Sequence, residues 1–195
     1  MILTGSSTLH QKEAVRKARE MLRKNPIFLD TETTGLLQSD VVIELAVIDQ
    51  NGQVIIDSLI KPILPIPADA TRIHGITDAM TKDAPFWLEV WKELKNIFTT
   101  TPIAAYNAEF DIRMLKQTHT LNKQIWPYEI QSYDIMKVFS EFVGEWNSYH
   151  HGFKYFKLED AGQIMGIPLP NTHRALADAR LARELLLKIA AETIS

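Results

Sequence analysis

A hairpin signal in the first third of the chain constrains the fold more than any other feature of the sequence. Asn51-Gly52 separates two apolar runs, Val41 to Asp49 and Val54 to Lys61. Because Asn-Gly favours the tight turns that join antiparallel strands, we expect these runs to pair as a hairpin. A further apolar run, Ile27 to Glu32, precedes them, so the sheet is predicted to begin with antiparallel strands.

Helical patterns dominate the rest of the chain. Thr8 to Asn25 has apolar residues at helical spacing, and the same spacing follows Pro85 and recurs from about Arg174 to Glu192. Since strands come first and later alternate with helices, the fold class is predicted to be α/β with a mixed sheet. The remaining predicted elements are strands at Pro102 to Tyr106 and Gln131 to Tyr133, and helices at Ile112 to Thr118, Ile135 to Phe142 and Leu158 to Met165.

The composition of the chain limits the classes of protein to which it can belong. A chain of 195 residues, 46% hydrophobic and 23% charged, is typical of one globular domain with a substantial core. It has no cysteine, which excludes disulfides and thiolate metal sites. No apolar run approaches the roughly 18 residues that span a bilayer, and Met1 to Leu9 lacks the apolar core of a signal peptide, so a cytoplasmic location is expected. The formal net charge of -3 argues against a protein that coats nucleic acid by bulk electrostatics.

Two carboxylates end the first predicted strand. Asp30 and Glu32 lie two positions apart within Phe28 to Leu36, which reads F-L-D-T-E-T-T-G-L. Strand side chains alternate in direction, so both carboxylates point to one face, where their repulsion favours a bound cation. The alternative for an isolated Asp-x-Glu is a strand that runs out into an acidic turn. That alternative is the commoner one, so other residues must decide.

Further titratable residues occupy the ends of predicted elements. Asp111 follows a predicted strand, Asp178 lies one turn into the last predicted helix, and His173 precedes Asp178 near that helix's N-terminus. Thr172 is a possible cap of the same helix. Strand ends and helix starts are where α/β sheets build sites. Glu44 lies inside an apolar strand, where a lone carboxylate is expected to be paired, and a structural or supporting role is favoured over exposure on an edge.

Three motifs in order resemble the DnaQ-like 3'–5' exonucleases, in the DEDDh branch of the DEDD superfamily. F-L-D-T-E-T-T-G is similar to the first family motif, A-Y-N-A-E-F-D to the second and H-R-A-L-A-D to the third, H-x-A-x-x-D. The family's H-G-I-T stretch lies between the first two motifs. The resemblance runs from about Pro26 to the end of the chain and implies a ribonuclease H-like fold, with a mixed central sheet flanked by helices.

The resemblance also implies the catalytic residues and their cofactors. By its motifs, Asp30, Glu32, Asp111 and Asp178 hold two divalent cations, Mg²⁺ or Mn²⁺, and His173 is the general base. The ligand chemistry agrees, because an all-carboxylate site without cysteine suits hard, oxygen-seeking cations. Two such ions about 4 Å apart suit an in-line displacement at phosphorus.

Other residues lie where relatives contact the terminal nucleotide. The turn from Thr33 to Leu36 resembles the family's nucleotide cradle, with Leu36 as an apolar wedge under the last base. Tyr106 stands where many relatives have His, a departure that is not expected to affect metal binding. The implied substrate-binding residues are Thr33, Thr34, Gly35, Leu36, Asp69, His74, Asn107 and Phe110.

The predicted function is a proofreading or repair exonuclease that releases nucleoside 5'-monophosphates from the 3' end of single-stranded DNA. A single strand is expected because the terminal base must be splayed into a small pocket, and the acidic body predicts weak, salt-sensitive, distributive binding. One alternative is an RNA 3'-end-processing enzyme of the ribonuclease T or oligoribonuclease kind, which differs in contacts to the 2'-hydroxyl. Another is a catalytically silent polymerase-binding module, which is disfavoured because all five catalytic positions are present.

Two domains of unequal size are predicted, an N-terminal helical extension at residues 1–25 and an exonuclease domain at 26–195. The extension, or the aromatic segment from Gly144 to Lys157, is a candidate for docking a polymerase or a second copy of the chain. A metal site is not expected at His150-His151, because no third ligand is spaced to join the pair.

Overall fold

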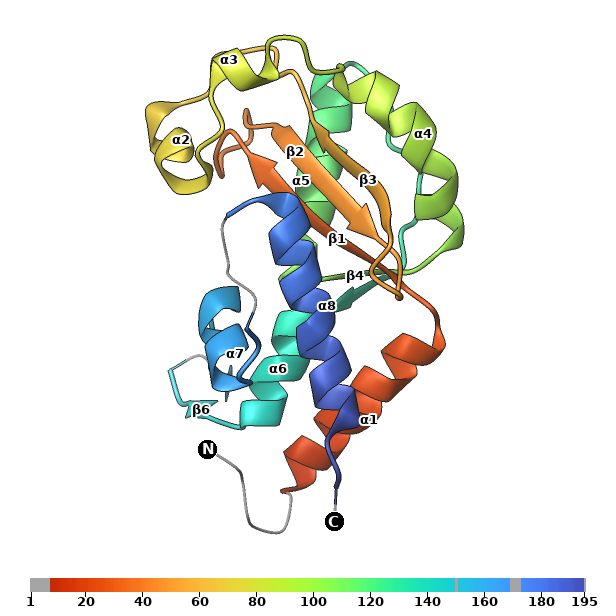
Figure 1. Ribbon diagram of the computed structural model, residues 1–195, viewed down its shortest axis with the longest axis vertical. Coiled ribbons are helices and arrows are strands. Elements are labelled where there is room, and N and C mark those ends of the chain that lie inside the picture. The colour runs from red at the N-terminus through yellow and green to blue at the C-terminus, as the bar shows by residue number, and fades with distance from the viewer. Residues whose placement is uncertain (1–7, 150, 169–172, 195) are drawn as a thin grey trace.

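The structure, a computed structural model, describes residues 8–149, 151–168 and 173–194. Figure 1 shows the arrangement of its helices and strands. In chain order the elements are α1 (Leu9–Arg23), β1 (Ile27–Thr33), β2 (Val42–Ile48), β3 (Val54–Leu59), α2 (Ala68–His74), α3 (Asp78–Thr81), α4 (Trp87–Thr100), β4 (Ile103–Ala105), α5 (Ala108–Leu121), β5 (Ser132–Asp134), α6 (Ile135–Val143), β6 (Trp146–Asn147), β7 (Gly152–Phe153), α7 (Leu158–Ile164) and α8 (Ala175–Ala191).

The main sheet has five strands in the order β3-β2-β1-β4-β5. β1, β2 and β3 pair antiparallel, and β4 and β5 continue the sheet parallel to β1. The predicted hairpin at Asn51-Gly52 is therefore confirmed, as is the mixed α/β class. Because β1 lies between β2 and β4, it is a central strand of the sheet.

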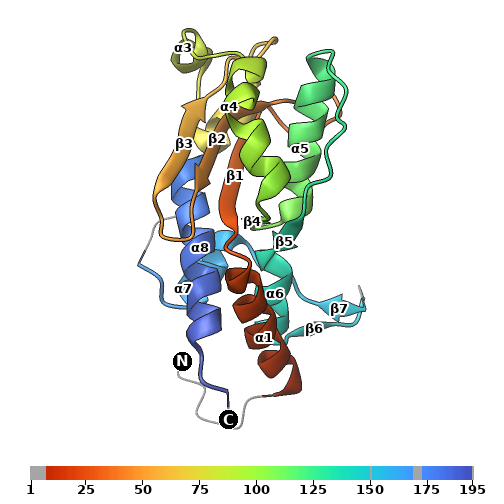
Figure 2. The ribbon, with the colours of Figure 1, turned by 90° about the vertical axis from the view of Figure 1, so that its right-hand side faces the viewer.

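Helices cover both faces of this sheet, with α8 on one side of β1 and α4 and α5 on the other (Figure 2). Phe28 packs in a buried core with residues of α1, α6 and α8, whereas Leu29 packs in a second core with residues of α4 and α5. Successive residues of β1 thus point to opposite layers, as the alternation of a strand requires. The next residue on the α8 side is Asp30.

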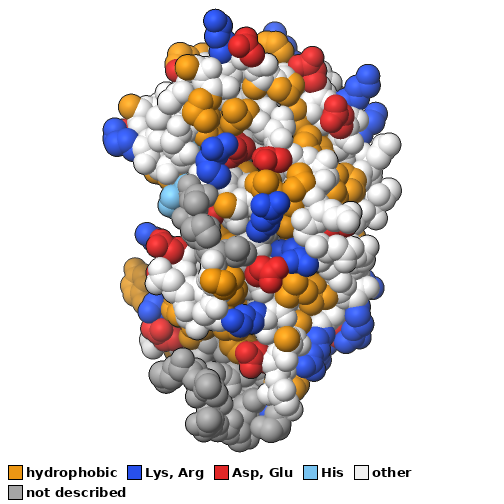
Figure 3. Space-filling view, in the orientation of Figure 1, with side chains coloured by type: hydrophobic (Ala, Val, Ile, Leu, Met, Phe, Trp, Pro, Cys, Tyr) orange, Lys and Arg blue, Asp and Glu red, His pale blue; other side chains and the backbone are white. Residues whose placement is uncertain are grey.

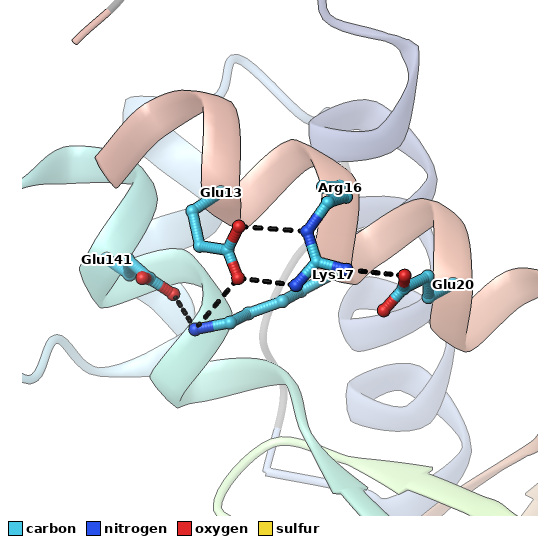
Figure 4. Close-up of polar contacts among 5 residues, drawn as sticks. All are labelled: Glu13, Arg16, Lys17, Glu20 and Glu141. Atoms are coloured by element: carbon cyan, nitrogen blue, oxygen red, sulfur yellow. Dashed lines mark hydrogen bonds and ion pairs between the residues drawn. The ribbon is translucent and has the colours of Figure 1, made fainter. Parts of the chain in front are cut away.

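The predicted N-terminal helix is confirmed as α1, and it packs against α6 and α8. Ala14, Val15 and Ala18 are fully buried in the core that these helices share. Lys17 Nζ also donates to Glu141 Oε2 of α6 at 2.7 Å, as Figure 4 shows. The division of the chain at residue 26 into an extension and a domain stays a prediction.

The structure differs from the predicted elements in three places. Helix α5 begins at Ala108 and not at Ile112, so Asp111 lies within its first turn. The strand before it ends abruptly because Asn107 adopts a left-handed conformation with φ 66°, and its N–H donates to Asp134 Oδ1 at 3.2 Å. Helices α2 and α3, and the short β6–β7 hairpin inside the aromatic segment, were not predicted.

Two sequence predictions involve residues outside the described ranges, namely Thr172 as a cap and His150 of the His150-His151 pair. Among the described residues, none of the helices is both long and apolar enough to cross a membrane.

Candidate active site

The C-terminal half of β1 places two predicted ligands on one face of the sheet. Asp30 and Glu32 are half-buried, while Thr31 and Thr33 are buried. Since Phe28 packs toward α8 and strand side chains alternate, Asp30 and Glu32 also project toward α8.

Helix α8 supplies the third carboxylate. Asp178 lies in the first turn of this helix and is buried. Small buried residues such as Ala175, Ala179 and Ala182 allow the helix to lie close to the sheet. Asp30, Glu32 and Asp178 each offer a carboxylate oxygen, and these oxygens lie within 4.8 Å of one another. The structure therefore brings three of the four predicted ligands together.

The fourth carboxylate, Asp111, comes from the opposite layer. It lies in the first turn of α5 and is 3% exposed. Thr31 Oγ1 donates a hydrogen bond to Asp111 Oδ1 at 2.7 Å, so the residue between Asp30 and Glu32 holds this carboxylate in place. Of the charged side chains near Asp30, Asp111 has the largest effect on its pKa, followed by Asp178 and Glu32. All four carboxylates therefore lie close enough for their charges to interact.

Burial and mutual repulsion disfavour the charged forms of these groups. Burial and the charges of Asp111 and Asp178 raise the pKa of Asp30 well above its ordinary value. Burial, followed by the charges of Asp178 and Glu44, raises the pKa of Glu32 to about 8. Burial raises the pKa of Asp111 to about 7, although the hydrogen bond from Thr31 favours its charged form. Carboxylates gathered in this way need protons or cations between them, and their oxygen donors fit hard divalent cations.

The turn after β1 is held in a defined shape by polar contacts. Thr34 Oγ1 donates to Asp40 Oδ1 at 2.8 Å, and the Leu37 N–H donates to Asp40 Oδ2 at 2.6 Å. Gln117 of α5 donates from Nε2 to the carbonyl of Leu37 at 2.8 Å. A Cβ at Gly35 would lie 2.6 Å from Asp40 Oδ2, so a larger residue here would displace the Asp40 side chain from its contacts with the turn. The predicted nucleotide cradle, Thr33 to Leu36, is therefore anchored by two residues outside it.

Two histidines border this region. His74 is buried at the end of α2, and its Nδ1 accepts a hydrogen bond from the N–H of Ile76 at 3.0 Å. Burial lowers the pKa of His74, with smaller effects from the Thr33 backbone and from the charges of Glu44, Arg174 and His173. His173 is exposed and directly precedes Arg174, the residue that caps α8. The two imidazoles thus lie close enough to interact electrostatically.

The other predicted substrate contacts are more scattered. The side chain of Leu36 is 73% exposed on the turn. Phe110 is half-buried, and the guanidinium of Arg113 lies 5.2 Å from the centre of its ring. Asn107 is exposed at the start of α5. Asp69 lies on the exposed side of α2 in an ion pair with Arg72, and so is not drawn into the carboxylate cluster.

Sequence reasoning did not single out several residues that shape this site. Asp40 and Gln117 anchor the turn, Thr31 orients Asp111, and Arg174 pairs with Glu44. Thr31 and Arg174 lie within the recognised motifs, so their contacts could have been sought there. Asp40 and Gln117 lie outside every motif, and no sequence signal pointed to them.

Comparison with known proteins assigns the chain to a family. The sequence profile of the RNase T family, described as exonucleases, matches residues 27–186, which is most of the chain. The chain belongs to the exonuclease family. The predicted DnaQ-like 3'–5' exonuclease resemblance and the prediction that the protein is an enzyme, a nuclease, are confirmed. Its dependence on divalent metal agrees with the family and with the carboxylate cluster.

This exonuclease resembles proteins of phages and bacteria. It is 37% identical over 172 residues to the uncharacterized exonuclease CP81 of Escherichia phage 186, a match that covers 85% of this chain and 88% of that protein. It is 29% identical over 160 residues to the DNA polymerase III subunit epsilon of Treponema pallidum, covering 80% and 72% of the two chains.

A solved structure confirms the predicted ribonuclease H-like fold. Exonuclease X in complex with 5' overhanging duplex DNA superposes with a TM-score of 0.62 at 27% identity. The match covers 86% of this exonuclease and 94% of that chain. The mixed sheet and its flanking helices are thus shared over nearly the whole of the smaller chain.

Proposed function

We propose that this protein is a metal-dependent 3'–5' exonuclease that removes nucleoside 5'-monophosphates from the 3' end of single-stranded DNA. The observation that carries the proposal is the convergence of Asp30, Glu32 and Asp178, whose oxygens lie within 4.8 Å of one another at the end of the central strand. Asp111, oriented by Thr31, completes the proposed ligand set from the other layer. Such a set of oxygens is suited to phosphodiester hydrolysis.

The chain's own residues have distinct proposed roles. Asp30, Glu32, Asp111 and Asp178 would hold two divalent cations, Mg²⁺ or Mn²⁺, which would activate water and stabilise the leaving 3'-oxygen. His173 is the proposed general base that accepts the proton of the attacking water. Its exposed position before α8 leaves the imidazole accessible to water and substrate.

The turn after β1 is the proposed seat of the terminal nucleotide. Thr33, Thr34, Gly35 and Leu36 form its floor, and the exposed Leu36 offers an apolar contact to the last base. His74 and Asp69 from α2, and Asn107 and Phe110 from the start of α5, are the further proposed contacts. Asp69 would have to leave Arg72 to reach a nucleotide, so its contribution is expected to be the smallest of this set.

DNA is the favoured substrate because the relatives include a DNA polymerase subunit and an exonuclease whose structure was solved in complex with DNA. On the face shown in Figure 3, Lys and Arg side chains are interspersed with Asp and Glu side chains, which supports weak and salt-sensitive binding. A short single strand needs few phosphate contacts, and splaying its terminal base costs less than opening a paired end.

The polarity of degradation tests the proposal. A 5'-labelled single-stranded DNA is expected to yield a ladder of products that shorten from the 3' end, with nucleoside 5'-monophosphates released. Phosphorothioate linkages at the 3' end should protect the strand, whereas the same linkages at the 5' end should not. Protection by the 5' block alone would overturn the proposed polarity.

The proposed base is tested by His173→Ala. Turnover is expected to fall by about 100- to 10,000-fold, the range typical of general bases, while the Mg²⁺ concentration for half-maximal activity stays unchanged. A large rise in that concentration would instead make His173 a metal ligand.

Matched DNA and RNA oligonucleotides separate the proposal from the alternative of an RNA 3'-end-processing enzyme. Because discrimination between the sugars depends on contacts to the 2'-hydroxyl, faster turnover of RNA than of DNA would favour the alternative. Absence of degradation of either strand in Mg²⁺ or Mn²⁺ would favour a silent polymerase-binding module.

Association with a polymerase or with a second copy of the chain is a further proposal. Subunit epsilon of DNA polymerase III, a relative, is by its name part of a larger assembly. The candidate surfaces are α1, in the proposed extension at residues 1–25, and the aromatic segment, where Trp146 and Tyr149 are exposed. A measurement of mass in solution tests self-association. The exonuclease domain at 26–195 and the cytoplasmic location stay predictions.

A further inference from the structure

Glu44 is a buried carboxylate beside the proposed metal ligands. It lies on β2, is 2% exposed and faces Glu32 directly across the antiparallel β1–β2 pair. Residues directly opposite in such a pair share one face of the sheet, and like charges in that arrangement are destabilising. A buried charge at this position therefore requires partners.

Arg174 and Ala175 provide those partners. Arg174 Nε donates to Glu44 Oε1 at 2.9 Å and to Oε2 at 3.1 Å, and Arg174 Nη2 donates to Oε1 at 2.5 Å. The N–H of Ala175 donates to Glu44 Oε2 at 2.9 Å. Both carboxylate oxygens are thus occupied by hydrogen bonds. Among the described residues, the group of converging carboxylates does not include Glu44.

These contacts join β2 to the first turn of α8. Arg174 caps the helix, and its carbonyl accepts hydrogen bonds from the N–H groups of Ala177 and Asp178 at 2.9 and 3.1 Å. The same residue therefore binds the sheet through its side chain and starts the helix through its backbone. A planar guanidinium that binds a carboxylate through several donors fixes orientation as well as distance.

His173 immediately precedes this anchored residue. Its φ of 49° lies in the left-handed region, which is uncommon for a residue other than glycine and persists only where the surroundings hold it. The contacts of Glu44 fix the chain on the C-terminal side of His173.

We propose that Glu44 and Arg174 are positioning residues for His173. The proposal rests on the proposed function, because it presumes that His173 accepts a proton from the attacking water. Glu44 acts through Arg174 and Ala175, and neither its carboxylate nor the guanidinium is required to touch the substrate. Loss of their contacts would let His173 leave the productive geometry while Asp178 stays packed in α8.

Conservative variants test this inference. Glu44→Gln keeps the shape of the side chain but removes its charge, and Arg174→Lys keeps the positive charge but removes the planar set of donors. Each is expected to lower kcat on single-stranded DNA by about 10- to 100-fold, as outer partners of catalytic groups commonly do. KM should stay unchanged for both variants. The Mg²⁺ concentration for half-maximal activity should stay unchanged for Arg174→Lys, which keeps the positive charge, whereas Glu44→Gln also removes a charge that raises the pKa of Glu32.

Glu141→Gln is the matched control. It breaks the ion pair between Glu141 and Lys17, which joins α1 to α6 and contains none of the proposed catalytic residues (Figure 4). This variant is expected to lower Tm without changing kcat. Comparing its kcat with that of the Glu44 and Arg174 variants at similar Tm separates positioning from a general loss of stability.

A double-mutant cycle with His173→Ala decides the outcome. If Glu44 and Arg174 act through His173, adding either variant to His173→Ala causes no further loss of kcat. Equal losses in the two backgrounds, or a wild-type kcat in both single variants, would overturn the inference. If His173→Ala alone keeps the wild-type kcat, the proposed role of His173 fails, and the positioning role fails with it.

Discussion

Removal of divalent cations is expected to make the stability of this exonuclease fall as pH rises. In the folded protein burial raises the pKa of Glu32 to about 8 and that of Asp111 to about 7. In an unfolded chain such carboxyl groups titrate near about 4. Between these values the folded state retains protons that the unfolded state has lost. The free energy of unfolding is therefore highest at the acidic end of this range and falls as pH rises toward 8.

The size of the effect follows from the number of retained protons. Each proton held only by the folded state changes the free energy of unfolding by about 1.4 kcal/mol per pH unit. Glu32 and Asp111 together contribute at most about 3 kcal/mol per pH unit, and Asp30, whose pKa is also raised, adds to this contribution. Because Glu32 is only half-buried, solvent screening reduces the expected slope to about 1 kcal/mol per pH unit. For a chain of this size that corresponds to a fall in Tm of about 2 to 4 °C per pH unit.

Thermal unfolding in EDTA, followed between about pH 5 and about pH 7, measures this slope. Added Mg²⁺ should raise Tm more at the higher pH, because fewer protons then compete for the carboxylates. Glu32→Gln should reduce the slope, whereas Glu109→Gln, which alters a carboxylate with an 85% exposed side chain, should leave it unchanged. The lowered pKa values of His74 and His119 act in the opposite direction over part of this range, so the comparison with Glu32→Gln decides the test. Equal slopes in wild type and Glu32→Gln would refute the argument that the carboxylates repel one another without a cation.

Two substitutions near the carboxylate cluster are expected to have different effects. Gly35→Ala should weaken the binding of DNA, and Thr31→Val should weaken the binding of Mg²⁺. Gly35→Ala places a Cβ 2.6 Å from Asp40 Oδ2, and the resulting strain of about 1 to 3 kcal/mol should raise KM for DNA by about 5- to 150-fold, measured by steady-state kinetics. An unchanged KM would show that the turn does not contact the substrate. Thr31→Val removes the hydrogen bond to Asp111 and should raise its pKa further above about 7. At neutral pH the Mg²⁺ concentration for half-maximal activity should then rise by about 10-fold, and a metal titration that matches wild type would contradict that role for Thr31.

Strong local sequence patterns were enough to predict the main strands of the sheet and the direction of the side chains on β1. The Asn51-Gly52 turn determines the β2–β3 hairpin by itself, and the alternation along β1 places Asp30 and Glu32 on one face. The motif order then indicated which helices bring Asp111 and Asp178 to that strand. These features depend on residues within a few positions of one another or on the family resemblance.

Contacts between distant residues could not be predicted in the same way. The start of α5 depends on Asp134, which accepts a hydrogen bond from the Asn107 N–H across 27 residues of sequence. The turn after β1 depends on Gln117, 80 residues from Leu37, and the pairing of Glu44 with Arg174 spans 130 residues. Single residues such as these carry no periodic signal, so only the folded chain reveals them.

Degradation of 5'-labelled single-stranded DNA by Asp178→Asn tests the central claim most directly. This substitution keeps the shape of a side chain whose carboxylate converges with those of Asp30 and Glu32, but it removes the charge that a divalent cation requires. The variant is expected to fold and to lose nearly all exonuclease activity in Mg²⁺, as wild type does in EDTA. Degradation from the 3' end at the wild-type rate, in the variant or in EDTA, would contradict catalysis by cations held in this carboxylate cluster.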